Sequence, residues 1–198
     1  TMGYFEYGDA IFVILNGEVT PADKKPEIMK KELQWCKSVL DASDKKWRIV
    51  MTHAGPYTSN HDPLDVRDYY INDSEYSLDK MNVDLFLNGH DHIYIRSTVK
   101  NDIKVNTGDG TTYITGGTVG NKFYEYIPAR SDYSTDFYVD EEDKQVFSVI
   151  EFSEDSIKGT AYQKQDPDDW NSFKAVDSYE ILNLSLIHIS EPTRPLYI

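Results

Sequence analysis

Short apolar runs separated by polar connectors predict β-strands at several places along the chain. These runs are rich in branched and aromatic residues and recur along most of the sequence. In Val83–Leu87 every position except Asp84 is apolar, which is typical of a parallel strand covered on both faces. The segments for which we expect strands are Tyr7–Asn16, Trp47–Thr52, Val83–Leu87, Ile93–Val99, Thr111–Thr115, Gln145–Phe152, Ser156–Gln163 and Val176–Leu182.

A long helix is expected between the first two of these strands. Apolar side chains recur there at i, i+4, i+7 and i+11, namely Met29, Leu33, Cys36 and Leu40. This spacing places them on one apolar helix face. Pro26 suits the first turn of that helix. A second, short helix is expected at Ser74–Met81.

Two long segments lack a regular pattern. Ala54–Tyr76 is polar, and loops longer than about 12–15 residues are commonly functional, so we interpret it as a lid that faces a substrate. Its side chains of chemical interest are Tyr57, His61, Arg67, Tyr69 and Tyr70. Phe123–Asp143 is aromatic and acidic, and we expect an irregular rim there. A hairpin with its turn at Ser153–Asp155 should follow.

Histidines stand at the ends of two expected strands. His53 directly follows one strand, and His90 and His92 follow another after a break at Gly89. Open α/β sheets bind their ligands beyond the carboxyl ends of the strands. Neutral imidazole is the commonest metal ligand that proteins supply. The pattern therefore indicates a metal site.

Composition limits the possible classes of protein but does not identify the function. Hydrophobic residues make up 39% and charged residues 27% of the 198 positions, as in ordinary globular proteins. The net charge of −14 argues against binding to nucleic acid backbones. No apolar run approaches the roughly 18 residues of a membrane span, and no signal peptide is visible. The single cysteine, Cys36, excludes an internal disulfide and should be a buried thiol.

The histidine segments resemble a known family. Val50–His53 and Gly89–His92 are similar to the Val-x-x-His and Gly-His-x-His blocks of the calcineurin-like metallophosphoesterases. The continuation Ile93–Ser97 looks most like the purple acid phosphatase branch. Further segments that resemble the family are Tyr113–Gly117 and Val176–Leu182. The resemblance runs over residues 7–183 and covers the second half of such a domain.

This resemblance implies an α/β fold, the second half of a four-layer α/β/β/α metallophosphoesterase sandwich. It implies hydrolysis of phosphate monoesters by metal-bound hydroxide at a binuclear centre. In that centre His53 and His90 would bind one metal ion and His92 the other. The ions would be iron, zinc or manganese, the partner a small phosphorylated substrate, and the location extracellular or at the cell surface.

The family's Asp-x-His, Gly-Asp-x-x-Tyr and Gly-Asn-His blocks, which supply its remaining ligands, do not occur in this sequence. We therefore expect a fragment that binds metal poorly and is inactive by itself. Two alternatives stay open. One is a phosphodiesterase or nucleotidase with the same centre, and the other is a non-catalytic domain that has lost the site.

Several residues near the histidines admit two interpretations. His61 would contact the substrate phosphate or donate a proton, as the resemblance implies, or it is a solvated loop residue. Arg96 would form a structural ion pair rather than bind phosphate, and Asp91 would orient an imidazole or face solvent. Gly116 and Gly117 suggest a phosphate cradle, but no helix begins there, so we favour a structural role.

Both ends of the chain carry signs of a longer gene. A threonine precedes the first methionine, Met2, which suggests a start further upstream. Residues 184–195 resemble the translation of a sequencing-library adapter, which would also remove His188 from the candidate ligands. We therefore expect one partial domain at 1–183 and a non-native tail at 184–198.

Overall fold

The computed structural model of the chain describes residues 2–16, 26–59, 67, 69–71, 75–128, 134–139 and 144–183. His61 and the expected tail at 184–198 lie outside these residues. Within them the chain forms two β-sheets and a long helix, α1 (Pro26–Ala42). The larger sheet contains β1 (Gly3–Tyr7), β2 (Ala10–Ile14), β3 (Trp47–Met51), β4 (Leu85–Asn88), β5 (Tyr94–Lys100), β6 (Ile103–Lys104), β7 (Thr111–Gly116) and β8 (Thr135–Tyr138). The smaller sheet contains β9 (Val146–Phe152), β10 (Ser156–Lys164) and β11 (Phe173–Leu182).

The larger sheet has a parallel centre. Its strands follow the order β1-β2-β3-β4-β7-β5-β6, and β8 also pairs with β5. β2, β3, β4 and β7 run parallel to one another, whereas β1 is antiparallel to β2 and β5 is antiparallel to β7. The carboxyl ends of β3, β4 and β7 therefore lie at one edge of the sheet.

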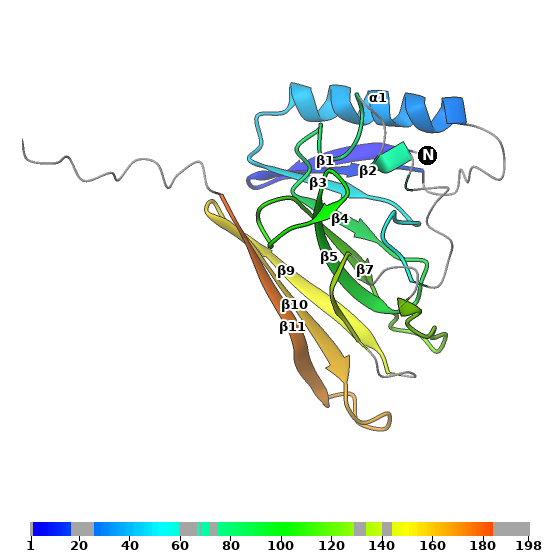
Figure 1. Ribbon diagram of the computed structural model, residues 1–198. Coiled ribbons are helices and arrows are strands. Elements are labelled where there is room, and N and C mark those ends of the chain that lie inside the picture. The colour runs from blue at the N-terminus through cyan, green and yellow to red at the C-terminus, as the bar shows by residue number, and fades with distance from the viewer. Residues whose placement is uncertain are drawn as a thin grey trace, which may run out of the picture.

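The helix covers one face of this sheet with the apolar face that the spacing predicted (Figure 1). Leu33 and Cys36 of α1 are buried against Val50 and Phe86, which point to this face from neighbouring strands. Burial raises the pKa of the Cys36 thiol to about 12, so it is an unreactive core residue at neutral pH. Among the described residues, no helix has the length and apolar character needed to cross a membrane.

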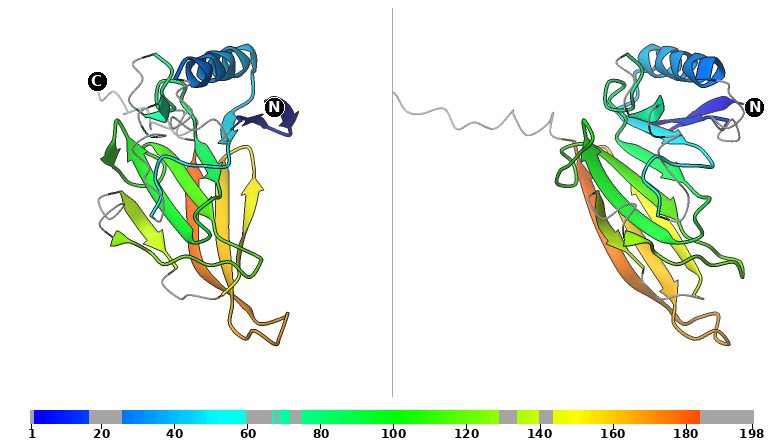
Figure 2. Two further views of the ribbon diagram at one scale, coloured as in Figure 1. Left: turned by 90° about the vertical axis from the view of Figure 1, so that its right-hand side faces the viewer. Right: turned by 45° about the vertical axis from the view of Figure 1, so that its right-hand side comes forward.

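The smaller sheet packs on the opposite face of the larger one (Figure 2). Alternate residues of the same strands, such as Ile49 and Leu85, point to this face and are buried against β10 and β11. Trp47 adds a polar link, because its indole Nε1 donates a hydrogen bond of 2.7 Å to the Ser153 carbonyl oxygen. The described residues thus form three layers, helix, sheet and sheet, and the predicted α/β class is confirmed.

A buried ion pair joins the two sheets. The Arg96 guanidinium on β5 donates to both carboxylate oxygens of Asp177 on β11, over 2.7 and 3.0 Å. The Tyr94 hydroxyl donates to the same carboxylate over 2.9 Å. Arg96 also lies 3.4 Å from Asp136 on β8. The structural interpretation of Arg96 is therefore confirmed.

Three local predictions were wrong or incomplete. β1 was not predicted, and β8 lies inside Phe123–Asp143, where we expected an irregular rim. The described residues of Ser74–Met81 form turns rather than a helix. These turns place Leu78 and Met81 in the core, and Val83 N closes them with a hydrogen bond of 3.1 Å to the Leu78 carbonyl oxygen.

Asp84 gives the stability of the fold a pH dependence. Burial raises the pKa of its carboxyl to about 6, against a hydrogen bond of 2.8 Å from Arg48 N that acts the other way. The folded state therefore holds this proton when the unfolded state has lost it, and stability falls as pH rises from about 4 to 6. We expect Asp84→Asn to raise the free energy of unfolding at pH 7 by on the order of 1–3 kcal/mol.

Urea unfolding at pH 4 and pH 7 measures this effect. At pH 4 most of the gain should be absent, because the wild-type carboxyl is then protonated in the folded state and about half protonated in the unfolded state. Asp9→Asn, in the exposed turn between β1 and β2, is the matched control and should change stability by less than about 0.5 kcal/mol at either pH. An equal gain from Asp84→Asn at both pH values would contradict the explanation.

Candidate metal centre

The histidines lie at the carboxyl edge of the parallel strands. His53 stands two residues beyond the end of β3, and His90 stands two residues beyond the end of β4. Backbone hydrogen bonds continue past both strand ends: Thr52 N donates to the Leu87 carbonyl oxygen over 3.1 Å, and Gly89 N donates to that of His53 over 2.9 Å. The two loops are therefore held in register by the backbone.

His53 and His90 face each other. Nδ1 of His90 lies 3.0 Å from Nε2 of His53, and the ring centroids are 4.9 Å apart at an interplanar angle of 78°. His90 is partly buried and His53 exposed. The structure thus brings together the two imidazoles that the resemblance assigns to one metal ion.

The turn that carries His90 and His92 has an uncommon backbone. Their φ angles are +73° and +50°, in the left-handed region that few residues other than glycine adopt. Such residues cost on the order of 1–3 kcal/mol and cluster at functional sites. This geometry lets two histidines that are only two residues apart take different partners.

His92 contacts a different segment. Its Nδ1 lies 3.0 Å from the carbonyl oxygen of Lys122, and its ring centroid lies 5.0 Å from that of Tyr124. Since a carbonyl oxygen only accepts hydrogen bonds, Nδ1 carries the proton and Nε2 keeps its lone pair in the neutral ring. Metal-ligating histidines commonly have this arrangement. Neither Lys122 nor Tyr124 was predicted to contact His92.

Asp91, between the two histidines, anchors a loop. It is fully buried, so the solvent-facing interpretation was wrong. Its Oδ2 accepts a hydrogen bond of 2.6 Å from Ser59 N, and Ser59 Oγ accepts one of 2.6 Å from Ile127 N. The histidine turn is thereby tied to the start of the loop after His53 and to the segment near residue 127.

Asn88 and Gly55, each two residues from one of the paired histidines, pack closely against each other, and neither was predicted as part of the site. Asn88 Nδ2 donates to Thr115 Oγ1 over 3.0 Å, while its buried Oδ1 has no hydrogen-bond partner among the described residues. A Cβ atom at Gly55 would lie 2.4 Å from the Asn88 side chain, so only glycine fits there. A glycine two residues after His53 was the one signal available in the sequence.

The described part of the loop Ala54–Tyr76 serves the core rather than a lid. Tyr57 is buried, packs edge-on against Tyr113 at 4.6 Å, and donates a hydrogen bond of 3.0 Å to Asp102. Arg67 pairs with the same carboxylate, and Tyr70 is buried. A substrate-facing role for these side chains was therefore wrong, while His61 lies outside the described residues.

The structural interpretation of the Gly116–Gly117 pair is confirmed. Gly117 has a φ of +76°, and a Cβ atom there would lie 3.0 Å from that of Val146. Val146 N also donates a hydrogen bond of 2.8 Å to the Thr118 carbonyl oxygen. The glycine thus lets the end of β7 approach the start of β9.

The histidine pair fits a metal ion in part. Two nitrogens 3.0 Å apart can both reach an ion that lies about 2.0–2.1 Å from each. A protein site usually supplies three or four ligands. Among the described residues, however, no group of three or more His, Cys, Asp or Glu side chains is arranged to hold one. These residues therefore provide part of a donor set.

One family model of known proteins matches the part of the chain that carries the three histidines. Residues 3–94 match the family model of the calcineurin-like phosphoesterases, a range that includes His53, His90 and His92. No curated protein matches the chain in sequence.

Solved structures share the fold at low sequence identity. A purple acid phosphatase from seeds of yellow lupin (Lupinus luteus) has a TM-score of 0.65 at 17% identity, over 100% of this chain and 36% of that one. GAP50, the anchor in the inner membrane complex of Plasmodium, has a TM-score of 0.59 at 18% identity, over 92% and 53%. PhoD has a TM-score of 0.54 at 14% identity, over 91% and 44%. The chain thus spans about a third to a half of the structures that it resembles.

Proposed function

We propose, from the calcineurin-like phosphoesterase pattern of residues 3–94, that this chain supplies the histidine part of a metal-dependent phosphatase acting on phosphate monoesters. The observation that carries the proposal is the 3.0 Å contact between His53 and His90. This contact joins the ends of two parallel strands, where the family pattern calls for metal ligands.

In this proposal His53 and His90 hold one metal ion and His92 holds the other through Nε2. Bound iron, zinc or manganese would polarise a phosphoryl oxygen and supply hydroxide near neutral pH. The chain's own contribution is positional. Gly89 N fixes the loop of His53, and the Lys122 carbonyl oxygen fixes the ring orientation of His92.

The substrate class follows from charge as well as from the resemblance. A chain with a net charge of −14 repels polyanions, so we propose a small phosphorylated substrate rather than a nucleic acid backbone. An extracellular or cell-surface location is part of the same proposal and rests on the resemblance alone. Phosphodiesters and nucleotides remain alternatives, because one centre of this kind can serve them.

We further propose that the isolated 198-residue chain binds metal weakly and does not turn over substrate. Two convergent imidazoles fall short of the three or four ligands that a stable site uses. The ligands to complete it would come from polypeptide beyond this chain, which spans only part of the structures that it resembles.

A non-catalytic domain is the second candidate. Two observations favour it: the incomplete donor set among the described residues, and the likeness to GAP50, which is described as an anchor. In this case the strands and the histidine turn would be kept for assembly with a partner rather than for hydrolysis.

Calorimetric titration of the chain with Zn²⁺ at pH 7 tests the proposal. We expect weak binding, and a loss of affinity of at least about tenfold in both His53→Ala and His90→Ala. His92→Ala is the matched control, because in the proposal it serves a different ion; the first equivalent of Zn²⁺ should bind to it nearly as to the wild type.

The outcomes separate the two candidates. Equal Zn²⁺ affinity in the wild type, His53→Ala and His90→Ala would exclude a metal site at these histidines and favour the non-catalytic domain. Hydrolysis of 4-nitrophenyl phosphate gives an independent reading. Steady activity of the isolated chain that His53→Ala abolishes would support the chemistry and contradict the predicted inactivity.

A further inference from the structure

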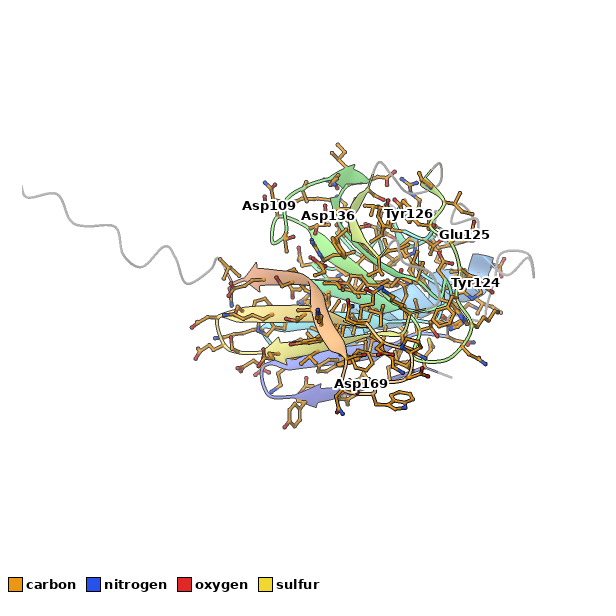
Figure 3. All side chains as sticks on the ribbon, turned by 90° about the horizontal axis from the view of Figure 1, so that it is seen from below. Asp109, Tyr124, Glu125, Tyr126, Asp136 and Asp169 are labelled. Carbon is orange, nitrogen blue, oxygen red and sulfur yellow. The ribbon has the colours of Figure 1, made fainter. Side chains whose placement is uncertain are left out.

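A cavity of about 120 Å³ lies beside His92. One wall is His92–Tyr94, which leads into β5, and another is the segment Phe123–Tyr126, here called the aromatic segment. Figure 3 shows Tyr124, Glu125 and Tyr126 close together on the side of the molecule away from Asp109. Asp109 lies before the start of β7, whereas the aromatic segment comes after the end of β7. The cavity therefore lies toward the carboxyl ends of the parallel strands, where the histidines are.

The aromatic segment is held against the histidine turn at both ends. At one end the carbonyl oxygen of Lys122 accepts the hydrogen bond from His92. At the other end Ile127 N bonds Ser59 Oγ, and Ser59 N bonds the buried carboxylate of Asp91. The cavity wall and the candidate metal ligand are therefore positioned by the same turn.

The rings of this wall are also fixed. Tyr124 lies against His92 at 5.0 Å between ring centroids, and the Lys122 ammonium lies 4.9 Å from the centre of the Tyr124 ring. Tyr126 stacks on Tyr138 of β8 at 3.6 Å with an interplanar angle of 10°. The wall therefore consists of aromatic side chains that are held in place by neighbours in the folded chain.

The size and the walls select one class of ligand. A cavity of about 150 Å³ in another protein binds benzene, so about 120 Å³ suits one six-membered ring rather than a fused ring system. Ring faces attract a further aromatic ring beyond the effect of buried area. Lys144 also lines the cavity, and a cationic side chain at its wall suits an electron-rich ring that bears oxygen.

We propose that this cavity binds the aromatic ring of an aryl phosphate monoester, a phenyl ring with its ester oxygen directed to the His92 end. The assignment of the ring to a phosphate ester rests on the function proposed above. The ring site itself depends only on the cavity and its walls. It makes Tyr124 a residue that determines specificity.

Titration of the 15N-labelled chain with phenol, followed by amide chemical shifts, tests the ring site without any phosphate. We expect saturable shifts centred on residues 117 and 123–126, and a dissociation constant for phenol that is about two to ten times larger in Tyr124→Ala. Tyr124→Phe keeps the ring face and should bind phenol as the wild type does. Cyclohexanol, of similar size without a ring face, should bind more weakly than phenol.

Trp170→Ala is the control for a general loss of aromatic surface. Trp170 is 71% exposed at the far end of the β10–β11 hairpin, where Lys164 lies 3.9 Å from its ring centre. Its removal should leave phenol binding unchanged. Equal binding of phenol and cyclohexanol, or equal phenol affinity in Tyr124→Ala and the wild type, would overturn the proposal.

A second titration separates this proposal from the proposed function. Phenyl phosphate in the presence of Zn²⁺ should bind more tightly than phenol, and His53→Ala should remove that difference while leaving phenol binding intact. If phenol binds in the cavity but phenyl phosphate gains nothing from Zn²⁺, the ring site stands and the phosphatase proposal fails. If phenol does not bind in the cavity but phenyl phosphate binds more tightly with Zn²⁺, the ring-site proposal fails and the phosphatase proposal stands.

Discussion

Replacing Asp177 by alanine is expected to lower the free energy of unfolding by about 3–5 kcal/mol. The side chains of Arg96 and Asp177 are only 12% and 6% exposed, and the carboxylate accepts two hydrogen bonds from the guanidinium. Its removal leaves the Arg96 charge buried, with Asp136 at 3.4 Å as the remaining carboxylate partner among the described residues, and it takes the acceptor from the Tyr94 hydroxyl. The two sheets lose their main polar link in the same step.

The matched control lies on the same strand. Glu180 on β11 pairs with Lys158 on β10 over 3.4 Å, but both side chains are about half exposed. An exposed pair contributes about 0.2–1 kcal/mol, so Glu180→Ala should have a small effect in the same urea titration. A loss below about 1.5 kcal/mol for Asp177→Ala would mean that the pair is solvated rather than buried.

Phe86→Ala is expected to cost a similar amount, about 3–5 kcal/mol, through a different mechanism. Phe86 on β4 is fully buried under the helix layer, with the rings of Tyr70 and Tyr113 each 5.5 Å from its own. Truncation leaves a cavity between residues that cannot collapse, because one belongs to the next strand of the sheet. Urea unfolding measures the loss.

Two other variants show whether packing is the cause. Phe86→Leu keeps most of the volume and should cost less than about 1.5 kcal/mol. Tyr7→Ala removes a ring of similar size from a position that is 80% exposed, and its effect should stay within about 0.5 kcal/mol. Comparable losses for Phe86→Leu and Phe86→Ala would point to ring contacts rather than cavity volume.

The strands around the site were predictable because their pattern is local. β3 and β4 are short apolar runs followed by histidines, and parallel neighbours bring such ends to one edge. The contact between His53 and His90 follows from that adjacency. β1 was harder, because four of its five residues are exposed and it pairs only at the rim of the sheet.

Other features depend on contacts between distant parts of the chain. β8 exists because it pairs with β5, about 40 residues earlier, and each of its residues is only half buried, so no alternation marks it. The spacing of Leu78 and Met81 suits a helix, but both are buried through turns whose hydrogen bonds reach Tyr70 and Val83. The same spacing is compatible with a helix or with turns, and the contacts made in the folded core determine which of them forms.

The surroundings of His92 could not be predicted for the same reason. Its partner Lys122 stands 30 residues further along, in a segment without regular pattern. From its position between two candidate metal ligands, Asp91 could be a surface residue. It is instead fully buried, and its carboxylate accepts a hydrogen bond from the backbone of Ser59, 32 residues earlier. A motif locates the ligands, whereas the groups that hold them are set by the folded chain.

An unpaired strand edge and exposed apolar side chains affect how the protein behaves in solution. In the part of the chain that the structure describes, no strand pairs with the outer edge of β9, and Phe5, Ile14 and Val149 expose apolar surface. An open edge of this kind favours pairing between copies, while a net charge of −14 keeps copies apart. Physiological salt limits that repulsion to about 8 Å and leaves the apolar attraction intact. Dilute buffer should therefore keep the chain monomeric, and added sodium chloride should drive it to associate.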